Sequence, residues 1–342
     1  MSEKIVRVGI WGIGRAGYGM IRSELLQFPE KFKIVAGYDI IPDRAAKLAD
    51  EVGAKAHADA ESFLADPNID MVVVATRSFN HVEHAIQALR AGKDVLVEKP
   101  MATSVEDVDR LYGVAAETGR KIVARHNRRF DKHFVLAKEI VAKGLIGEVY
   151  LVQIRTGGYN RRDDWQTMRQ FGGGQLFNWG PHCIDWALQF IGGRAVEIQP
   201  SLKRLVCAGE AEDFVKINMR GPGGALADIE INGAGVFPQP LMLVQGTRGA
   251  ISLSWDKYTL KYLAEELPPI LPKPGTPGEG SFGNTEKLQW TEVEAEIVPE
   301  DKATFWGAVY DRVALNKPFP ITPEQAREVI RVIDTASRIC TL

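Results

Sequence analysis

The sequence predicts an α/β protein in which an N-terminal doubly wound parallel sheet is followed by a C-terminal α+β domain with a large, mostly antiparallel sheet. The chain has 342 residues, which is enough for two domains of ordinary size. Short apolar runs alternate with helical segments in the first part, and the rhythm changes after His126, where longer strand-like segments dominate. We therefore expect one domain over residues 1–125 and a second over residues 126–342.

The first domain rests on apolar runs that are short enough to be strands. Because these runs are continuous rather than alternating, each strand is expected to be buried on both faces, which is typical of a parallel sheet covered by helices. The strands are expected at residues 6–11, 32–39, 71–75, 94–97 and 121–124, and the helices at about 14–26, 43–52, 79–91 and 104–118.

The second domain is expected to begin with a helix near residues 132–143 and to close with helices near 302–315 and 323–338. Glycine-rich turns such as 246–249 join the strand candidates between them. A stretch with five prolines at 267–284 reads as an exposed loop or arm, either a functional lid or a passive insertion. The strands are expected at residues 148–155, 195–207, 213–219, 225–232, 241–245, 250–254 and 259–263.

Composition narrows the classes of function. Lysine and arginine total 42 against 44 aspartate and glutamate, so no basic surface for nucleic acid or an anionic membrane is indicated. The three cysteines, Cys183, Cys207 and Cys340, are too few and too widely spaced for a disulfide framework or a zinc site, which fits a reducing compartment. No metal is expected.

The N-terminus and the length of the apolar runs bear on where the protein resides. The N-terminus leads within a few residues into the first strand and leaves no room for a signal peptide. The longest apolar runs are far shorter than the ~20 residues that span a bilayer. We therefore expect a cytoplasmic protein without a membrane partner.

A glycine-rich motif, Gly12-Ile13-Gly14-Arg15-Ala16-Gly17, directly follows the first strand and opens the first helix. Asp39 lies 22 residues after Gly17, at the end of the second strand. This combination is the fingerprint of a dinucleotide-binding domain. There Gly12 permits a tight turn, Gly14 lets the backbone approach the pyrophosphate, and Gly17 lets the helix pack on the strand. The N–H groups at the helix start would face the phosphates.

Asp39 and Arg44 bear on which dinucleotide binds. The Asp39 carboxylate would accept hydrogen bonds from the ribose hydroxyls and would repel a 2′-phosphate, so NAD is expected over NADP. Arg44 leaves NADP open. The competing interpretation of the motif is a glycine-rich turn without a ligand.

The strand at 94–97 is followed at once by Glu98, Lys99 and Pro100. Taken alone, the two charges are ordinary strand-end residues that reach for water. With the fingerprint upstream, this segment resembles the Glu-Lys-Pro motif of the glucose–fructose oxidoreductase / inositol dehydrogenase / MocA family. Further resemblances follow in the family's order over residues 5–190: Ala75-Thr76 with His81, then 126–131 (HNRRFD), 145–149 (LIGEV) and 172–185 (GGGQLFNWGPHCID).

The resemblance implies a Rossmann domain followed by an open-faced α/β domain, with a small polyol or sugar substrate in the cleft between them. It places the Ala75-Thr76 pair, His81 and Glu98 at the cofactor, and Lys99 beside the nicotinamide. It also implies a cis bond before Pro100 that aims the lysine. In the family, the large sheet often serves as the surface of a homodimer or homotetramer.

The chemistry that this resemblance implies is oxidation of a secondary alcohol. A hydride moves to the nicotinamide while the hydroxyl proton leaves, so the site needs a base and a cation that stabilises the developing alkoxide. Lys99 suits the second role and can share the proton transfer. A positive nicotinamide would lower its pKa, and a nearby Glu98 would oppose that shift. His182 is the candidate base, since an imidazole titrates near physiological pH; its competing role is that of a buried or capping histidine.

Asn178 stands where family members often have aspartate. If residues 178–185 are helical, Asn178, His182 and Asp185 share one face at i, i+4 and i+7, with Pro181 in the first turn or at a kink. An amide can hydrogen-bond to the histidine but supplies no charge. His182 would therefore work alone, use Asp185, or recruit an acid from Asp163-Asp164.

The segment 157–170 carries arginines, acids, Tyr159 and Trp165 just before the triple glycine. By resemblance it reaches over the nicotinamide and the substrate, where an aromatic face suits a sugar ring or the nicotinamide. We expect Trp165 at the cofactor and Tyr159 at the substrate. A solvated loop is the competing interpretation.

Asn127 and Arg128 are further candidates for substrate contacts, with helix-flanking surface charge as the alternative for the arginine. His57 and His133 have no supporting context and are expected at the surface.

Two classes of function remain open. The leading one is an NAD(P)-dependent dehydrogenase that acts on a secondary hydroxyl of a sugar, sugar derivative or cyclitol, with Lys99, His182 and Asn178 as the catalytic group. The other is a dinucleotide-binding sensor or regulator without turnover, which Asn178 motivates. A glycoside hydrolase or lyase that retains its NAD is a third reading. The presence of both Lys99 and His182 favours an enzyme.

Overall fold

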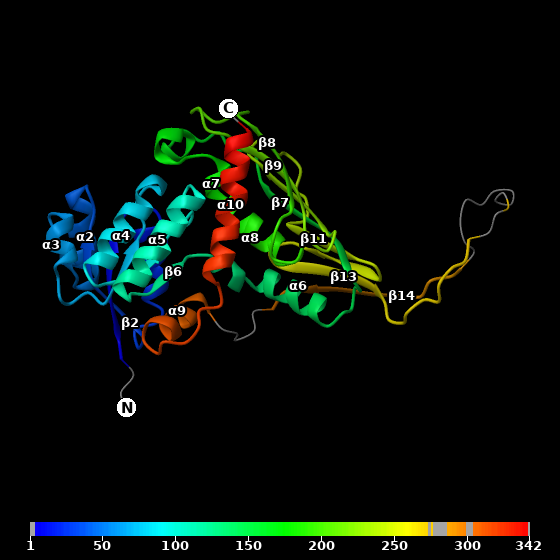
Figure 1. The fold of residues 1–342 in the computed structure, drawn as a ribbon, viewed down its shortest axis with the longest axis horizontal. Coiled ribbons are helices and arrows are strands. Elements are labelled where there is room, and N and C mark those ends of the chain that lie inside the picture. Colours follow the sequence, from blue (N-terminus) through cyan, green and yellow to red (C-terminus); the bar gives the residue numbers. More distant parts are fainter. Residues whose placement is uncertain (1–3, 273–274, 276–285, 299–303, 341–342) are drawn as a thin grey trace.

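The computed structural model describes residues 4–272, 275, 286–298 and 304–340, and it contains the two expected sheets (Figure 1). The N-terminal sheet has six strands in the order β3-β2-β1-β4-β5-β6, and all of its strand pairs are parallel. This part of the predicted fold class is confirmed. The strands are β1 (Val6–Trp11), β2 (Phe32–Tyr38), β3 (Lys55–Ala56), β4 (Met71–Val74), β5 (Asp94–Val97) and β6 (Ile122–Ala124).

Both faces of this sheet are buried, as the continuous apolar runs predict. Alternate residues of β4 enter two different apolar clusters, Val72 and Val74 on one side and Met71 and Val73 on the other. The first face packs on α4 and α5, and the second packs on the first helix, α2 and α9. The helices are α1 (Ser23–Leu25), α2 (Pro42–Val52), α3 (Ala60–Leu64), α4 (His81–Arg90), α5 (Val105–Thr118) and α9 (Phe305–Val313).

Helix α9 follows the second sheet in the chain, yet its buried face lies against the first. Trp306 and Tyr310 contact the ring of Phe32 edge-on, with centroid distances of 5.4 and 5.9 Å. The chain therefore returns to the N-terminal lobe after it has built the C-terminal sheet (Figure 1).

The C-terminal sheet has eight strands in the order β14-β13-β12-β11-β7-β10-β9-β8. Its pairs are antiparallel except for β7 with β10, which confirms the mostly antiparallel prediction. The strands are β7 (Val149–Gly157), β8 (Glu197–Lys203), β9 (Phe214–Arg220), β10 (Leu226–Asn232), β11 (Met242–Gly246), β12 (Gly249–Leu253), β13 (Lys257–Leu263) and β14 (Trp290–Glu296).

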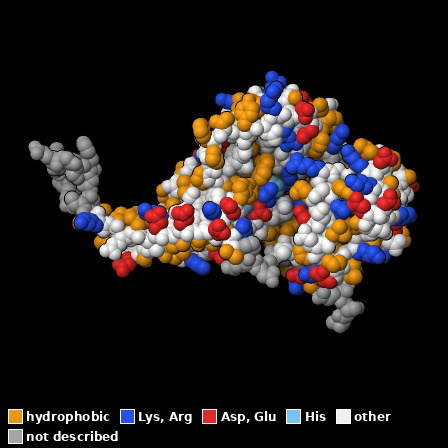
Figure 2. Space-filling view, turned by 180° about the vertical axis from the view of Figure 1, so that it is seen from behind, with side chains coloured by type: hydrophobic (Ala, Val, Ile, Leu, Met, Phe, Trp, Pro, Cys, Tyr) orange, Lys and Arg blue, Asp and Glu red, His pale blue; other side chains and the backbone are white. Residues whose placement is uncertain are grey.

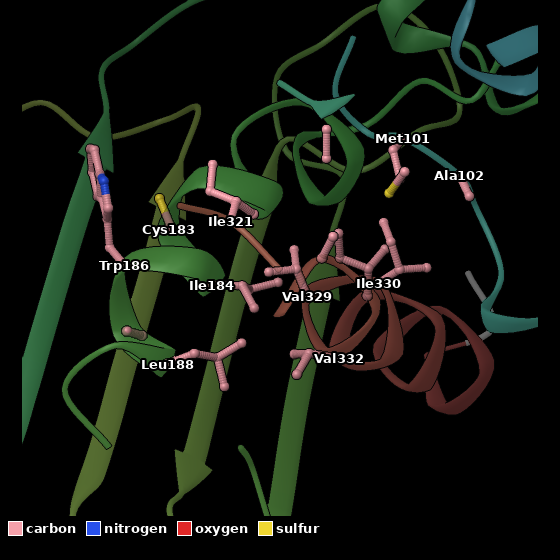
Figure 3. Close-up of a cluster of buried hydrophobic side chains, with 14 of the residues drawn as sticks. Met101, Ala102, Cys183, Ile184, Trp186, Leu188, Ile321, Val329, Ile330 and Val332 are labelled. Carbon is pink, nitrogen blue, oxygen red and sulfur yellow. The ribbon is translucent and has the colours of Figure 1, made fainter. Parts of the chain in front are cut away.

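Helices cover the face of this sheet that is turned toward the N-terminal lobe (Figure 1). Ile184 and Leu188 of α8 face Val329, Ile330 and Val332 of α10 (Figure 3). Met101 and Ala102, which follow β5, belong to the same apolar cluster, so the core is continuous between the lobes. The covering helices are α6 (Lys132–Ala142), α7 (Gln175–Asn178), α8 (Gly180–Leu188) and α10 (Pro323–Ile339).

Among the strands and α-helices of the described residues, β3, α3, β14 and α7 (Gln175–Asn178) have no counterpart among the expected elements. The strand expected at 195–207 ends earlier, at Lys203, because the Asp213 carboxylate accepts the backbone N–H groups of residues 205, 206 and 207 and holds them in a loop. Part of the proline-rich stretch, and the first residues of the helix expected at 302, lie outside the described residues. Among the described residues, none of the helices combines the length and the apolar character that a bilayer crossing requires.

The prediction of surface positions for His57 and His133 is wrong, because both imidazoles are buried. His57 Nε2 lies 3.1 Å from an oxygen of Asp66, and its ring meets Phe63 edge-on. His133 lies between the rings of Trp186 and Trp255, at centroid distances of 5.2 and 5.1 Å.

Candidate functional site

The glycine-rich loop joins β1 to the first helix, and a side chain at each of its three glycines would meet different surroundings. Gly12 has φ +94°, and a Cβ there would lie 2.6 Å from the carbonyl oxygen of Ala75. A Cβ on Gly17 would lie 2.0 Å from the carbonyl oxygen of Gly12. Gly14 differs, because a Cβ there would meet only Arg44 Nη1, at 3.9 Å. Gly14 therefore borders open space that a ligand can approach closely.

Backbone donors point to the same space. Within the described residues, no hydrogen bond takes the N–H groups of Gly14, Arg15 or Ala16. The Arg15 side chain is exposed, and the helix that follows begins with a π-helical turn (Gly17–Arg22). Free N–H groups at a helix start form a cradle for an anion, so these residues fit the pyrophosphate of a dinucleotide.

Asp39 lies beside this loop and is buried. Its Oδ2 accepts the N–H of Ile13 at 2.6 Å, and its Oδ1 accepts the N–H of Ile41 at 2.9 Å. Arg44 Nη1 lies 3.6 Å from Oδ1. Because each carboxylate oxygen has two lone pairs, Asp39 holds the loop and still has acceptor capacity for a hydroxyl.

His81 joins the loops that follow β4 and β5. Its Nδ1 lies 2.7 Å from the carbonyl oxygen of Pro100, and its Nε2 lies 3.1 Å from that of Thr76. The ring is fully buried, so it acts on the cleft by fixing these two loops. Ala75, just before Thr76, lies beside the glycine-rich loop, where its carbonyl faces Gly12. The Lys99–Pro100 bond is cis, as the resemblance implies.

Lys99 is half-buried and reaches across the cleft rather than into solvent. Its Nζ donates to both the carbonyl oxygen and the Oδ1 of Asn178, each at 2.9 Å. Burial lowers the pKa of Lys99 to about 8, with Arg125, Arg128 and Arg15 contributing and Glu98 opposing. The interpretation of Lys99 as a solvated end charge is therefore wrong.

Glu98 is buried directly beside this lysine. Its Oε2 accepts the backbone N–H of Lys99 at 2.8 Å, and its Oε1 accepts Arg125 Nη1 at 2.7 Å. Both carboxylate oxygens thus accept hydrogen bonds from groups other than the amine of Lys99.

His182 comes from the C-terminal lobe, in the first turn of α8, with Pro181 just before it. It is 6% exposed, and its Nδ1 has no hydrogen-bond partner among the described residues. Burial holds the pKa of His182 well below its usual value, and the charges of Lys99 and Arg128 add to this. The imidazole is therefore neutral at physiological pH, so one of its ring nitrogens is an acceptor.

The structure answers which acid supports His182. Asp185 accepts Nε and Nη2 of Arg129 at 2.7 and 2.6 Å, and Asp164 is paired with Arg162. Of the three options for His182, Asp185 is therefore taken by another partner and Asp164 is paired elsewhere, while Asp163 is exposed. No carboxylate within the described residues bonds to Nδ1 of this imidazole, which favours the option in which His182 works alone.

The residues expected at the substrate divide into two groups. The Arg128 guanidinium lies 4.5 Å from the ring centre of Trp179 and 5.3 Å from that of Trp255, and it bonds Asp131 at 3.0 Å, so it is more than surface charge. Asn127 Oδ1 is buried without a partner in the described chain.

The other group lies farther out. Tyr159 is 60% exposed, and Trp165 is half-buried in a 3₁₀ turn (Trp165–Thr167) that Asp164 caps. Among the described residues, neither makes a hydrogen bond or ring contact to Lys99 or His182. The surface between the two lobes is hollowed, and Lys and Arg side chains gather there (Figure 2).

The sequence patterns did not single out Trp179, Trp255 and Arg125 as neighbours of the candidate site residues. Trp179 lies at the junction of α7 and α8, and its ring meets that of His182 at 5.9 Å. The place of Trp179 between Asn178 and His182 was a usable signal, whereas Trp255 comes from a distant turn. No group of three or more His, Cys, Asp or Glu in the described chain is placed to hold a metal ion.

Comparison with family models gives two adjoining matches. Residues 6–126 match the model described as an oxidoreductase family with an NAD-binding Rossmann fold. Residues 134–252 match the GFO/IDH/MocA C-terminal domain. Together the two matches cover most of the chain and include parts of both lobes.

Among characterised relatives, a 1-carboxy-3-chloro-3,4-dihydroxycyclohexa-1,5-diene dehydrogenase of Comamonas testosteroni is 30% identical over 67% of this chain, and the match spans 58% of that relative's length. A scyllo-inositol 2-dehydrogenase (NADP(+)) of Bacillus subtilis is 26% identical over 97% of this chain and 92% of its own length. A 2,7-anhydro-N-acetylneuraminate hydratase of Mediterraneibacter gnavus is 27% identical over 72% of this chain and 67% of its own.

Solved structures share the whole fold. An NAD-binding protein from Listeria innocua superposes with a TM-score of 0.81 at 24% identity, covering 98% of this chain and 96% of that one. An oxidoreductase from Thermotoga maritima gives a TM-score of 0.80 at 23% identity, with 98% and 96% coverage. At these identities the likeness concerns the fold.

Proposed function

The chain belongs to the GFO/IDH/MocA family of NAD(P)-binding oxidoreductases, and on that premise we propose that it is an NAD-dependent dehydrogenase acting on a secondary hydroxyl of a sugar, sugar derivative or cyclitol. One observation carries the proposal: the amine of Lys99 leaves the carboxyl end of β5, in the lobe with the glycine loop, and meets Asn178 of the other lobe, one helical turn before His182. Open parallel sheets place their ligands at this end of the strands.

Residues 12–17 would hold the pyrophosphate of the cofactor, and Asp39 would bind the adenosine ribose. The cofactor, once bound, would supply the hydride acceptor. NAD is favoured because the buried Asp39 carboxylate would face a 2′-phosphate with like charge. Arg44 lies 3.6 Å from that carboxylate, which offsets part of the repulsion and makes NADP the second choice.

The residues of the cleft divide the proton chemistry. His182, neutral and without a hydrogen-bond partner at Nδ1, would accept the hydroxyl proton at a ring nitrogen. The Lys99 ammonium would donate a hydrogen bond to the developing alkoxide. Asn178 orients this ammonium through two neutral oxygens and leaves its charge uncompensated.

The test is to mix the purified protein with NAD and a panel of sugars, sugar derivatives and inositols, and to follow the absorbance of reduced nicotinamide. We expect turnover with at least one polyol. Lys99→Ala should abolish it and leave dinucleotide affinity nearly unchanged, whereas Lys33→Ala, at an exposed position of β2, should turn over like the parent. Equal turnover by Lys99→Ala would refute the role of Lys99.

A second candidate function is a lyase or hydratase reaction in which NAD stays bound and is oxidising only transiently. Two relatives, from Mediterraneibacter gnavus and Escherichia coli, are named hydratases, which favours this reading. It would show as product formation without net reduced nicotinamide. Tight dinucleotide binding with neither outcome would support a sensor instead.

We also propose assembly as a homodimer or homotetramer through the C-terminal sheet. By strand register, the exposed Leu226 and Trp290 lie on the face of the sheet that carries Leu151 and Lys261, opposite to the buried Val152 and Leu260. A contiguous apolar surface on that face would serve as an interface. Light scattering on the purified protein would give the mass, and a monomer at micromolar concentration would refute this assembly.

A further inference from the structure

A buried ionic network lies directly behind Lys99 and has no place in the chemistry above. Arg125, at the end of β6, is 1% exposed. Its Nη1 donates to Glu98 Oε1 at 2.7 Å, and its Nη2 lies 2.7 Å from both oxygens of Glu24. Trp306 Nε1 donates to Glu24 Oε2 at 2.7 Å. Four segments far apart in the chain meet at this guanidinium.

Such a network is costly to maintain for stability alone. Taking ions out of water carries a desolvation penalty that often exceeds the Coulombic gain, and apolar side chains of similar volume commonly serve as well. The Nε of Arg125 is buried without a partner in the described chain, which adds to the cost. A buried arginine in this position calls for a role besides packing.

The geometry of Glu98 shows what the arginine changes. The carboxylate is buried and stands next to the half-buried Lys99 in the chain, so the two charges would be expected to pair. Instead, one oxygen accepts Arg125 Nη1 and the other accepts the backbone N–H of Lys99. The described residues contain no ion pair between Glu98 and the Lys99 amine, which reaches Asn178.

We propose that Arg125 is a positioning residue for Lys99: by binding Glu98 it withdraws that carboxylate from the amine, which is then free to extend across the cleft to Asn178 and to substrate. Glu24 belongs to the helix that follows the glycine loop, so the same guanidinium links the cofactor-binding loop to the strand end that carries Lys99. The catalytic meaning of this arrangement rests on the function proposed above; the arrangement itself is independent of it.

The charges around the amine come from several elements, and each bears on its titration. Glu98 on β5's end favours the ammonium, and Arg125, Arg128 and Arg15 disfavour it. The imidazoles of His81 and His182 also face it. Removing Arg125 should therefore raise the pKa of Lys99, because Glu98 would be left uncompensated. Removing the charge of Glu98 should lower it, because Arg125 would remain.

The opposite signs supply the test. The rate at which acetic anhydride acetylates Lys99 would be measured against pH by peptide mass spectrometry, without cofactor or substrate. For the parent we expect a midpoint at about 8. Glu98→Gln should move it down by about one pH unit and Arg125→Met up by about one. Arg125→Lys should restore the parental midpoint.

The matched control is Arg129→Met. This variant breaks another buried arginine–carboxylate pair, the one between Arg129 and Asp185. It should leave the midpoint of Lys99 unchanged. If Arg125→Met does not fold, Glu98→Gln alone decides. Shifts of the same sign in both variants, or no shift in Glu98→Gln, would overturn the proposal. The expected shifts in a protein that oxidises no polyol would instead refute the proposed function and leave this inference standing.

Discussion

The two sides of the cleft are built from different kinds of contact. On the side proposed for the cofactor, residues 12–17 and Asp39, the backbone itself forms the site, through close approaches of glycines, free N–H groups and the N–H of Ile13 that Asp39 holds in place. On the substrate side, residues 126–128 and 178–182, side chains form it. Of the buried side-chain atoms without a partner in the described chain, three lie there, at His126, Asn127 and His182, and none lies on the cofactor side.

On one side of the cleft the buried polar side-chain atoms are satisfied within the chain, and on the other side several buried polar atoms are available to a ligand. Each buried polar atom left without a partner costs about 1–3 kcal/mol. A substrate rich in hydroxyl groups would satisfy several such atoms at once. The cofactor side requires a fixed backbone shape, whereas the substrate side requires a ligand with the right donors.

After the loss of turnover expected for Lys99→Ala, the largest effect is expected from the imidazole on the side proposed for the substrate. His182→Gln removes the proposed base, and positioned general bases contribute typically 10²–10⁴-fold, so kcat should fall by about that factor. Dinucleotide affinity, measured by NADH fluorescence titration, should not change. His57→Gln, which alters a buried histidine that contacts Asp66, serves as the control. Full activity of His182→Gln would place the base elsewhere.

Two glycines sharpen the comparison on the cofactor side. Gly12→Ala meets both the positive φ and the carbonyl of Ala75, and it should weaken NADH binding roughly a hundredfold and lower the Tm, because such strain costs ~1–3 kcal/mol or more. Gly14→Ala has room in the free protein, so its Tm should equal that of the parent while binding weakens. If Gly14→Ala binds normally, the ligand does not approach the loop there.

Asn178 connects the two sides through Lys99. With a pKa of about 8, Lys99 loses its charge above that pH, so the rate should fall on the alkaline side. Because the pKa of His182 lies well below its usual value, its imidazole stays neutral at mildly acidic pH, and the rate should not change there. Asn178→Asp would favour the ammonium, raise the pKa of Lys99 by about one unit, and move the alkaline limb up by the same amount. If the alkaline limb of the kcat/KM profile does not move, the group that titrates there is not Lys99.

The smallest effect concerns the choice of dinucleotide. Asp39→Asn keeps an acceptor for the N–H of Ile13 but removes the charge. Since charge-assisted hydrogen bonds are about twice as strong as neutral ones, the preference for NAD over NADP should shrink by roughly fivefold. The ratio of kcat/KM for the two cofactors measures it. An unchanged ratio would show that Asp39 acts on the loop alone.

The parallel sheet was predictable because its strands are buried on both faces and read as continuous apolar runs. The edge strands were not. β3 consists of the exposed Lys55 and Ala56, and β14 alternates acids with Thr291, Val293 and Ala295, so neither carries a continuous apolar run. Local motifs singled out the segments that carry Lys99 and His182, and the structure brings these segments together through Asn178.

The support around these residues depends on contacts that no local pattern contains. Arg125 meets Glu24, which lies 101 positions away, and Asp185 is taken by Arg129 rather than by the histidine that shares its helix face. His133 follows a charged residue and precedes an apolar one, yet two tryptophans from separate elements enclose it. Tertiary packing, not periodicity, decides such positions.

A crystal structure with NAD and an oxidisable polyol is the most direct measurement. Lys99 Nζ and a ring nitrogen of His182 should lie within hydrogen-bond distance of the same hydroxyl, on the carbon that faces the nicotinamide. A polyol bound elsewhere, or an amine turned away from the dinucleotide, would contradict the proposed arrangement of the two residues.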